Sequence, residues 1–104
     1  MVDEGQVVLV TGAAGGIGKA CVAYLLANKR KVMATDVNQQ GLEAAFGAGR
    51  ENLVVQACDV TDATQCAAVV DATVNAFGRI DALIHWGGRH SIKTWDDLTA
   101  EDVD

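Results

Sequence analysis

Residues Val7–Val10 are four apolar residues in a row, and a cluster of glycines follows them directly. An apolar run of this kind is typical of a strand that is buried on both faces. The segment after the glycines has the spacing of an amphipathic helix, in which we expect Ile17, Cys21, Tyr24 and Leu25 to lie near one face. A strand, a glycine turn and a helix in this order form a phosphate-binding site, because free N–H groups and the positive dipole end at the helix start face the anion.

Three glycines of this turn each have a predicted role. Gly12 permits a tight reversal of the chain, Gly16 lets a pyrophosphate approach the backbone, and Gly18 lets the helix pack closely on the strand. The alternative is a glycine-rich surface turn that binds no ligand. A P-loop is excluded, because that motif needs Gly where the chain has Ala13, and Ser or Thr where it has Ala20.

Thr11 precedes the first glycine, so the motif reads Thr-Gly-x3-Gly-x-Gly. This motif resembles the cofactor fingerprint of the short-chain dehydrogenase/reductase family, and the resemblance extends over nearly the whole chain. It implies that the chain binds a nicotinamide dinucleotide. It also implies that the longer protein is an oxidoreductase, which transfers a hydride between an alcohol and a carbonyl group of a small-molecule substrate.

Composition limits the possible partners and location. The chain has 104 residues, half of them apolar, and a formal net charge of −6. Without a basic cluster, nucleic acid and anionic membranes are poor partners. No apolar run is long enough to cross a bilayer and no signal peptide is visible, so we expect a cytoplasmic protein. Cys21, Cys58 and Cys66 lack metal-ligand spacing and are interpreted as reduced thiols.

Apolar patterns and turn residues predict strands at Gln6–Val10, Lys31–Thr35, Leu53–Cys58 and Asp81–Trp86. Helices are predicted between them, at Gly16–Asn28, Gln39–Phe46 and Ala63–Phe77. This alternation predicts an α/β fold, a partial Rossmann-like doubly wound parallel sheet. The glycine motif favours the strand order 3-2-1-4 over a flavodoxin-like order.

Asp36 ends the second predicted strand, 18 residues after Gly18. A carboxylate there accepts hydrogen bonds from the ribose hydroxyls of an adenosine and repels a 2′-phosphate. The resemblance adds that relatives using the phosphorylated cofactor tend to carry a basic residue at places such as Gly15 and Val37. We therefore predict NAD rather than NADP as the cofactor. The alternative is that Asp36 is a helix cap or a turn residue.

Two further aspartates lie beside strands. For Asp59 and Val60, after the third strand, the resemblance implies contacts of the side chain and the backbone with the adenine amino group. The alternative for Asp59 is a turn residue. For Asp81, before the fourth strand, the resemblance implies a structural role.

The end of the fourth strand departs from the family pattern. The family typically has Asn-Asn-Ala-Gly where this chain has His85, Trp86, Gly87 and Gly88. The resemblance implies that this turn lines the ribose on the nicotinamide side of the cofactor. We interpret His85 as a hydrogen-bonded structural residue and Trp86 as an aromatic core residue. The alternative for His85 is a general base, but the sequence identifies no nucleophile or partner acid near it.

The family's catalytic residues are a Ser, a Tyr-x3-Lys pair and an Asn, and in the family they follow the stretch present here. Tyr24 is followed four residues later by Asn28 and is interpreted as a packing residue. We therefore predict one truncated half domain, inactive alone, with a polar loop after Gly88 and a helix beginning near Thr99. Its fourth strand would be an unpaired edge that favours self-association. The alternatives are a non-catalytic nucleotide-binding module and a self-assembling module.

No catalytic or metal-binding residue is predicted. The predicted cofactor-binding residues are Thr11, Gly12, Gly15, Gly16, Ile17, Gly18, Asp36, Val37, Asp59, Val60, Gly87 and Gly88.

Overall fold

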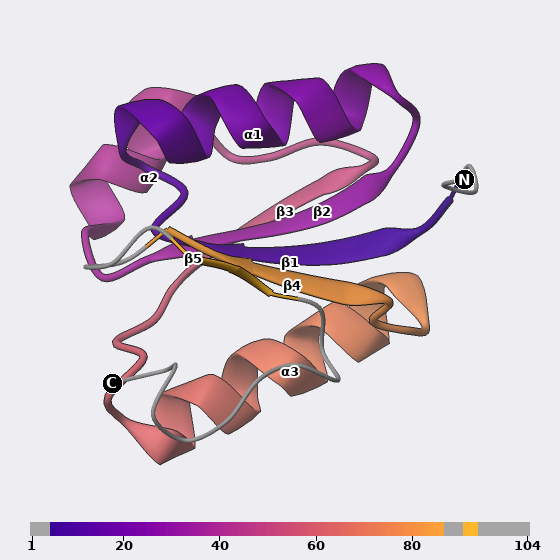
Figure 1. Cartoon of the computed structure of the whole chain (residues 1–104). Coiled ribbons are helices and arrows are strands. Elements are labelled where there is room, and N and C mark those ends of the chain that lie inside the picture. Colours follow the sequence, from indigo (N-terminus) through magenta and orange to yellow (C-terminus); the bar gives the residue numbers. More distant parts are fainter. Residues whose placement is uncertain (1–4, 87–90, 94–104) are drawn as a thin grey trace.

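The computed structural model describes residues 5–86 and 91–93. The strands are β1 (Val7–Thr11), β2 (Lys31–Asp36), β3 (Leu53–Ala57), β4 (Ala82–His85) and β5 (Ser91–Lys93). The helices are α1 (Gly16–Ala27), α2 (Gln39–Phe46) and α3 (Ala63–Phe77). Strands and helices alternate as far as β4, as the sequence predicts (Figure 1).

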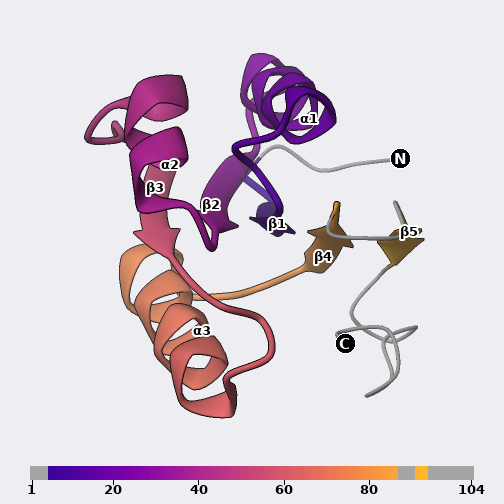
Figure 2. The same ribbon diagram turned by 90° about the vertical axis from the view of Figure 1, so that its left-hand side faces the viewer.

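The strands form a sheet in the order β3-β2-β1-β4-β5, of which the first four are parallel. Helices α1 and α2 cover one face of the sheet and α3 covers the other (Figures 1 and 2). The predicted Rossmann-like fold with the order 3-2-1-4 is confirmed. A flavodoxin-like order would pair β1 with β3, whereas here β1 lies between β2 and β4.

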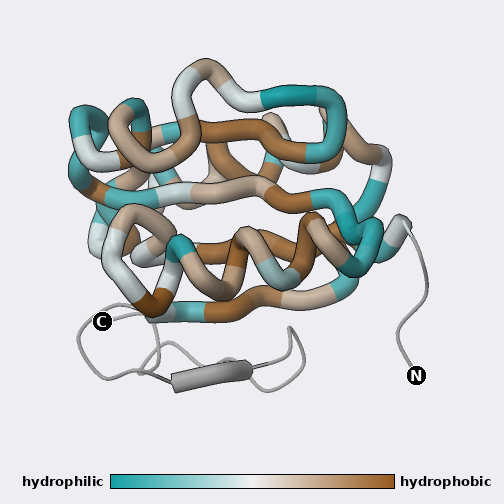
Figure 3. Tube along the Cα trace, turned by 90° about the horizontal axis from the view of Figure 1, so that it is seen from above, coloured by the Kyte–Doolittle hydropathy of each residue, from teal (hydrophilic) through white to brown (hydrophobic). Residues whose placement is uncertain are grey.

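The core explains the apolar run at the start of the chain. Every residue of β1 is buried, because helices cover both faces of the sheet. Val8 and Val10 pack in the cluster beneath α1 and α2, whereas Leu9 packs in the cluster on the side of α3. In Figure 3 most hydrophobic stretches of the chain lie between the turns, and the hydrophilic residues concentrate in the turns themselves.

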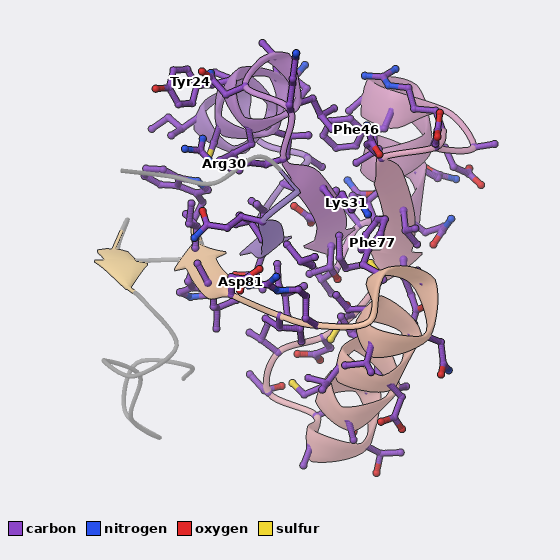
Figure 4. The ribbon with its side chains drawn as sticks, turned by 90° about the vertical axis from the view of Figure 1, so that its right-hand side faces the viewer. Tyr24, Arg30, Lys31, Phe46, Phe77 and Asp81 are labelled. Atoms are coloured by element: carbon purple, nitrogen blue, oxygen red, sulfur yellow. The ribbon has the colours of Figure 1, made fainter. Side chains whose placement is uncertain are left out.

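Helix α1 buries only part of the predicted face. Leu25 lies in the core and Cys21 packs against it, as predicted, whereas the side chains of Ile17 and Tyr24 are more than half exposed. The buried residues of the helix are Gly18, Val22 and Leu25. Figure 4 shows Tyr24 pointing away from the sheet, so its interpretation as a packing residue is wrong. The reason is that Gly18 lies very close to the turn after β1. Gly18 and the two residues in line with it along the helix, Val22 and Leu25, therefore face the sheet. None of the helices in the described residues is long and apolar enough to span a membrane.

The fourth strand is not an unpaired edge, and that prediction is wrong. Strand β5 pairs with β4 in antiparallel register, Ile84 opposite Ile92, within the segment predicted as a polar loop. The physical reason is that β4 carries backbone donors and acceptors that need partners, and three residues are enough to supply them. The argument for self-association from an open β4 therefore loses its basis. The helix predicted near Thr99 lies outside the described residues.

Asp81 ties the beginning of β4 to the beginning of β1 (Figure 4). Its Oδ2 accepts a hydrogen bond of 2.7 Å from the backbone N–H of Val7, and its Oδ1 accepts one of 2.9 Å from Nε of Arg79. Burial raises the pKa of the Asp81 carboxyl, but these hydrogen bonds outweigh burial and hold the pKa below its usual range. The predicted structural role of Asp81 is confirmed.

Replacing Asp81 with Ala removes the side-chain acceptor for the N–H of Val7, a fully buried residue. We expect the free energy of unfolding to fall by about 1–3 kcal/mol, the cost of leaving a buried donor unsatisfied. Urea denaturation measures this loss. The control is Asp71→Ala, which removes an exposed carboxylate on α3 and should change stability by less than about 0.5 kcal/mol. Equal stability of the two variants would contradict the role of Asp81.

Candidate functional site

A pocket of about 340 Å³ lies at the carboxyl ends of the parallel strands. This end of the sheet faces the viewer in Figure 2. The pocket is lined by seven of the predicted site residues, which are Thr11, Gly12, Gly15, Asp36, Val37, Asp59 and Val60. The structure thus brings together residues from the turns after β1, β2 and β3. Gly87 and Gly88 lie outside the described residues.

The turn between β1 and α1 has little space. Gly12 has a φ of +69°, in the left-handed region that glycine adopts without strain. A Cβ atom built on Gly18 would lie 2.2 Å from the Gly12 carbonyl oxygen and 2.8 Å from the Cα of Ala13. The close packing predicted for Gly18 is therefore confirmed. By contrast, a Cβ atom on Gly16 would meet nothing within 4 Å, so protein atoms leave the space beside its backbone open.

The start of α1 differs from the starts of the other two helices. The side chains of Asn38 and Asp62 cap α2 and α3 by accepting hydrogen bonds from backbone N–H groups. Helix α1 begins after Gly15, has no side-chain cap and has no acidic residue in its first turn. Its first N–H groups and the positive end of its dipole therefore favour an anion at this place. Gly16, Ile17 and Gly18 form this first turn.

Asp36 connects the two turns beside the pocket. Its Oδ2 accepts a hydrogen bond from the N–H of Ala14, after β1, and its Oδ1 accepts one from the N–H of Asn38, after β2, each at 3.0 Å. The carboxylate is half-buried and lines the pocket together with the exposed side chain of Val37. Asp36 is therefore a turn residue and a pocket residue at once, so the two interpretations of the sequence are compatible.

Asp59 begins the turn after β3. The hydroxyl and the backbone N–H of Thr61 donate to Asp59 Oδ1 at 2.7 and 2.9 Å, and they hold the pKa of this carboxyl below its usual range. These bonds fit the turn interpretation of Asp59. Asp59 and Val60 also line the pocket, so their position is compatible with the predicted contact with an adenine. That contact stays a prediction.

Three lining residues are missing from the predicted site: Cys58, His85 and Trp86. They lie at the carboxyl ends of β3 and β4, and that position beside the predicted residues is the signal that could have identified them. Thr11 Oγ1 and His85 Nδ1 form a buried hydrogen bond, which confirms His85 as a hydrogen-bonded residue. Trp86 packs against the cluster beneath α1, as expected of an aromatic core residue.

Cys58 is a buried thiol at the edge of the pocket. Burial raises the pKa of the Cys58 thiol to about 11, and the nearby Cys66 thiol and Asp59 carboxylate add to the rise. The Cys66 thiol donates to the carbonyl oxygen of Val60 at 3.4 Å. Cys58 is therefore protonated at neutral pH and acts here as a small apolar group.

Comparison with known proteins identifies the family. The family model described as short chain dehydrogenase matches residues 6–104. The D-threitol dehydrogenase of Mycolicibacterium smegmatis is 38% identical over 104 aligned residues, which cover 97% of this chain and 40% of that protein. This chain belongs to the short-chain dehydrogenase family. The family resemblance of the Thr11–Gly18 motif is thereby confirmed.

Solved structures of this family have the same fold. The crystal structure of levodione reductase matches 79% of this chain and 34% of its own, with 37% identity and a TM-score of 0.70. The crystal structure of NAD+-bound xylitol dehydrogenase matches 77% of this chain and 32% of its own, with 37% identity and a TM-score of 0.66. The chain thus spans about a third to two fifths of the length of these relatives.

The raised pKa of Cys58 predicts a loss of stability in alkaline solution. The thiol ionises near pH 9 in the unfolded chain and near pH 11 in the folded chain, so the unfolded state is favoured progressively between these values. We expect the contribution of Cys58 to fall by about 1–3 kcal/mol over this range. Thermal melts from pH 8 to 11 should show a shallower decline for Cys58→Ala than for the parent or for Cys21→Ala. An equal decline in all three would contradict the shift.

Proposed function

We propose that the chain binds NAD(H) in this pocket, as the cofactor-binding part of an oxidoreductase that interconverts an alcohol and a carbonyl compound. The observation that carries this proposal is the start of α1, which has no side-chain cap and leaves the backbone of Gly16 open. An anion the size of a pyrophosphate suits such a helix start. The family and the NAD+-bound xylitol dehydrogenase structure point to a nicotinamide dinucleotide.

The arrangement of the strands supports one orientation of the dinucleotide. Asp36, at the end of β2, would hold the ribose of the adenosine, and the first turn of α1 would hold the pyrophosphate. Strand β4 lies on the other side of β1 from β2, so the nicotinamide half would extend toward β4. The nicotinamide ring supplies the hydride acceptor when NAD is bound.

We propose NAD rather than NADP because of the charge of Asp36. Its two oxygens already accept bonds from Ala14 and Asn38, so the carboxylate has a fixed position at the pocket. A 2′-phosphate on the adenosine ribose would bring a second negative charge to that position, which is unfavourable. The ribose hydroxyls of NAD can instead donate to the carboxylate.

We further propose that this chain alone turns over no substrate, since the sequence contains no Tyr-x3-Lys pair. The whole protein would act on a small alcohol or carbonyl compound, as the names D-threitol dehydrogenase and levodione reductase suggest.

The free thiols Cys21, Cys58 and Cys66 support a reducing compartment such as the cytoplasm. Neither alternative, a non-catalytic nucleotide-binding module or a self-assembling module, is favoured by a feature of the residues that the structure describes.

Replacing Gly16 with Val tests the site without disturbing the fold, because the added side chain starts in open space. We expect NAD to bind at least about tenfold more weakly, since the side chain would occupy the approach of the pyrophosphate to the backbone. Calorimetric titration measures the affinity, with light scattering beside it to follow the oligomeric state.

The matched control is Ala23→Val, which adds similar bulk at an exposed position later in α1. Its affinity for NAD should equal that of the parent, and its melting temperature should fall by no more than about 5 °C, because Val is a weaker helix former than Ala. Unchanged affinity in Gly16→Val, or failure of the parent to bind NAD at all, would overturn the proposed function.

Replacing Asp36 with Asn removes the negative charge but keeps an acceptor for one of the two backbone N–H groups. We expect the affinity for NADP to rise about tenfold and the affinity for NAD to fall by less, because the repulsion of the 2′-phosphate is lost. The control is Asp62→Asn, which changes the same charge at the cap of α3 and should leave both affinities unchanged. If the parent binds both cofactors equally, Asp36 does not select between them.

A further inference from the structure

Cys58 and Cys66 are thiols that the proposed contacts with NAD leave without a role. Cys58 directly follows β3, and its backbone N–H donates to the carbonyl oxygen of Asp36 at 2.9 Å. Cys66 lies in the first turn of α3 and is half-buried. Cys58 is a buried member of the apolar cluster on the side of α3, and Cys66 packs against this cluster.

The turn between β3 and α3 holds the two cysteines beside each other (Figure 2). Gln65 Oε1 accepts a hydrogen bond of 2.9 Å from the N–H of Asp59, so the direct neighbours of the two cysteines are bonded. The Cys66 thiol donates to the carbonyl oxygen of Val60 at 3.4 Å. Burial raises the pKa of the Cys58 thiol, and the charge and hydrogen bonding of Cys66 raise it further, because the two thiols are neighbours.

The third cysteine lies on the other face of the sheet. Cys21 belongs to α1 and packs against the cluster beneath α1 and α2, whereas Cys58 and Cys66 lie on the side of α3. The sheet separates these two sides (Figure 2). Within one molecule, the thiols that can meet are therefore Cys58 and Cys66.

We propose that Cys58 and Cys66 are a redox-sensitive pair, which a hydroperoxide such as hydrogen peroxide oxidises to an intramolecular disulfide. In a reducing compartment such a bond is transient, because cellular thiols reduce it again. The pair lies at the pocket, since Cys58, Asp59 and Val60 line it in succession. The disulfide itself does not depend on the proposed function, whereas its effect on NAD binding does.

The two thiols differ in access, which gives them different parts in the reaction. Cys66 is half-buried, whereas Cys58 is only 4% exposed. The thiolate of Cys66 attacks one oxygen of the peroxide, the O–O bond breaks, and the second oxygen leaves as water after taking up a proton. Cys66 is then a sulfenic acid.

The second step closes the disulfide. The sulfur of Cys58 attacks the sulfur of Cys66, the S–S bond forms, and the S–O bond breaks. The hydroxyl group leaves with the proton of Cys58 as a second molecule of water. In total the two thiols lose two electrons and two protons, and one hydrogen peroxide is reduced to two molecules of water.

Oxidation changes a contact at the pocket. The Cys66 proton that is donated to the carbonyl oxygen of Val60 is lost, so this oxygen loses its donor. Val60 lines the pocket, and its turn must also adjust to the new covalent bond. We expect the disulfide form to bind NAD about fivefold more weakly, the equivalent of one neutral hydrogen bond.

Peptide mapping of the parent chain tests the pair without any substitution. Trypsin leaves both cysteines in one peptide, residues 51–79, whereas cleavage before Asp59 and Asp62 separates them. After treatment with hydrogen peroxide, without reductant, we expect the tryptic peptide to lose two hydrogen atoms and the fragments cut at aspartate to stay linked. Free thiols at both positions, or links only between two chains, would overturn the inference.

Variants test the order of the two steps. Cys58→Ala should leave a sulfenic acid on Cys66, which dimedone traps, because the second thiol is missing. Cys66→Ser should leave Cys58 as a thiol. The matched control is Cys21→Ala, which should form the disulfide at the rate of the parent. A trapped sulfenic acid on Cys58 would overturn the assigned order.

Calorimetric titration with NAD measures the effect on the pocket before oxidation, after it, and after reduction with dithiothreitol. The fivefold loss should occur in the parent and in Cys21→Ala, should be reversed by the reductant, and should be absent in Cys66→Ser. Equal affinity of the reduced and disulfide forms would overturn the effect on the pocket. Absence of NAD binding by the reduced parent would overturn the proposed function, while the peptide map still decides whether the pair exists.

Discussion

The contact between Gly18 and the carbonyl group of Gly12 is the constraint on which the rest of the site depends. Not even one carbon atom fits between them, so α1 must begin directly over the end of β1. This approach brings the helix start to the pocket. It also selects the row of Gly18, Val22 and Leu25 as the face that packs on the sheet. This one steric requirement thus points the positive end of the helix dipole at the pocket. It also determines which residues of the helix pack in the core.

Asp36 shows how a negative charge and a site for an anion can lie side by side. The carboxylate bonds the N–H of Ala14, which precedes α1, and so does not use the N–H groups of the first helical turn. Those groups stay available for a phosphate, while in the proposed complex the carboxylate would face the neighbouring sugar. Because the same side chain also bonds the N–H of Asn38, the turns after β1 and β2 keep a constant separation.

The sequence predicted what short-range patterns determine. The apolar run of β1, the three glycines and the alternation of strands and helices were enough for the fold, and the strand ends brought most lining residues together. The exposed face of α1 was not predictable, because Ile17 and Tyr24 have apolar character but the glycine contact rotates them outward. Strand β5 was missed because three residues carry no periodicity of their own, and its pairing depends on β4.

The two sides of the pocket are encoded in different ways. On the side of α1 the backbone determines the site, and a side chain at Gly18 would displace the helix. On the side of β4 the site consists of side chains, His85 bonded to Thr11 and Trp86 packed on the core. The hydroxyl of Thr11 can donate or accept, so it can pair with an imidazole as readily as with an amide. Residues at the end of β4 can therefore change what the pocket recognises while the turn that would receive the phosphates stays the same.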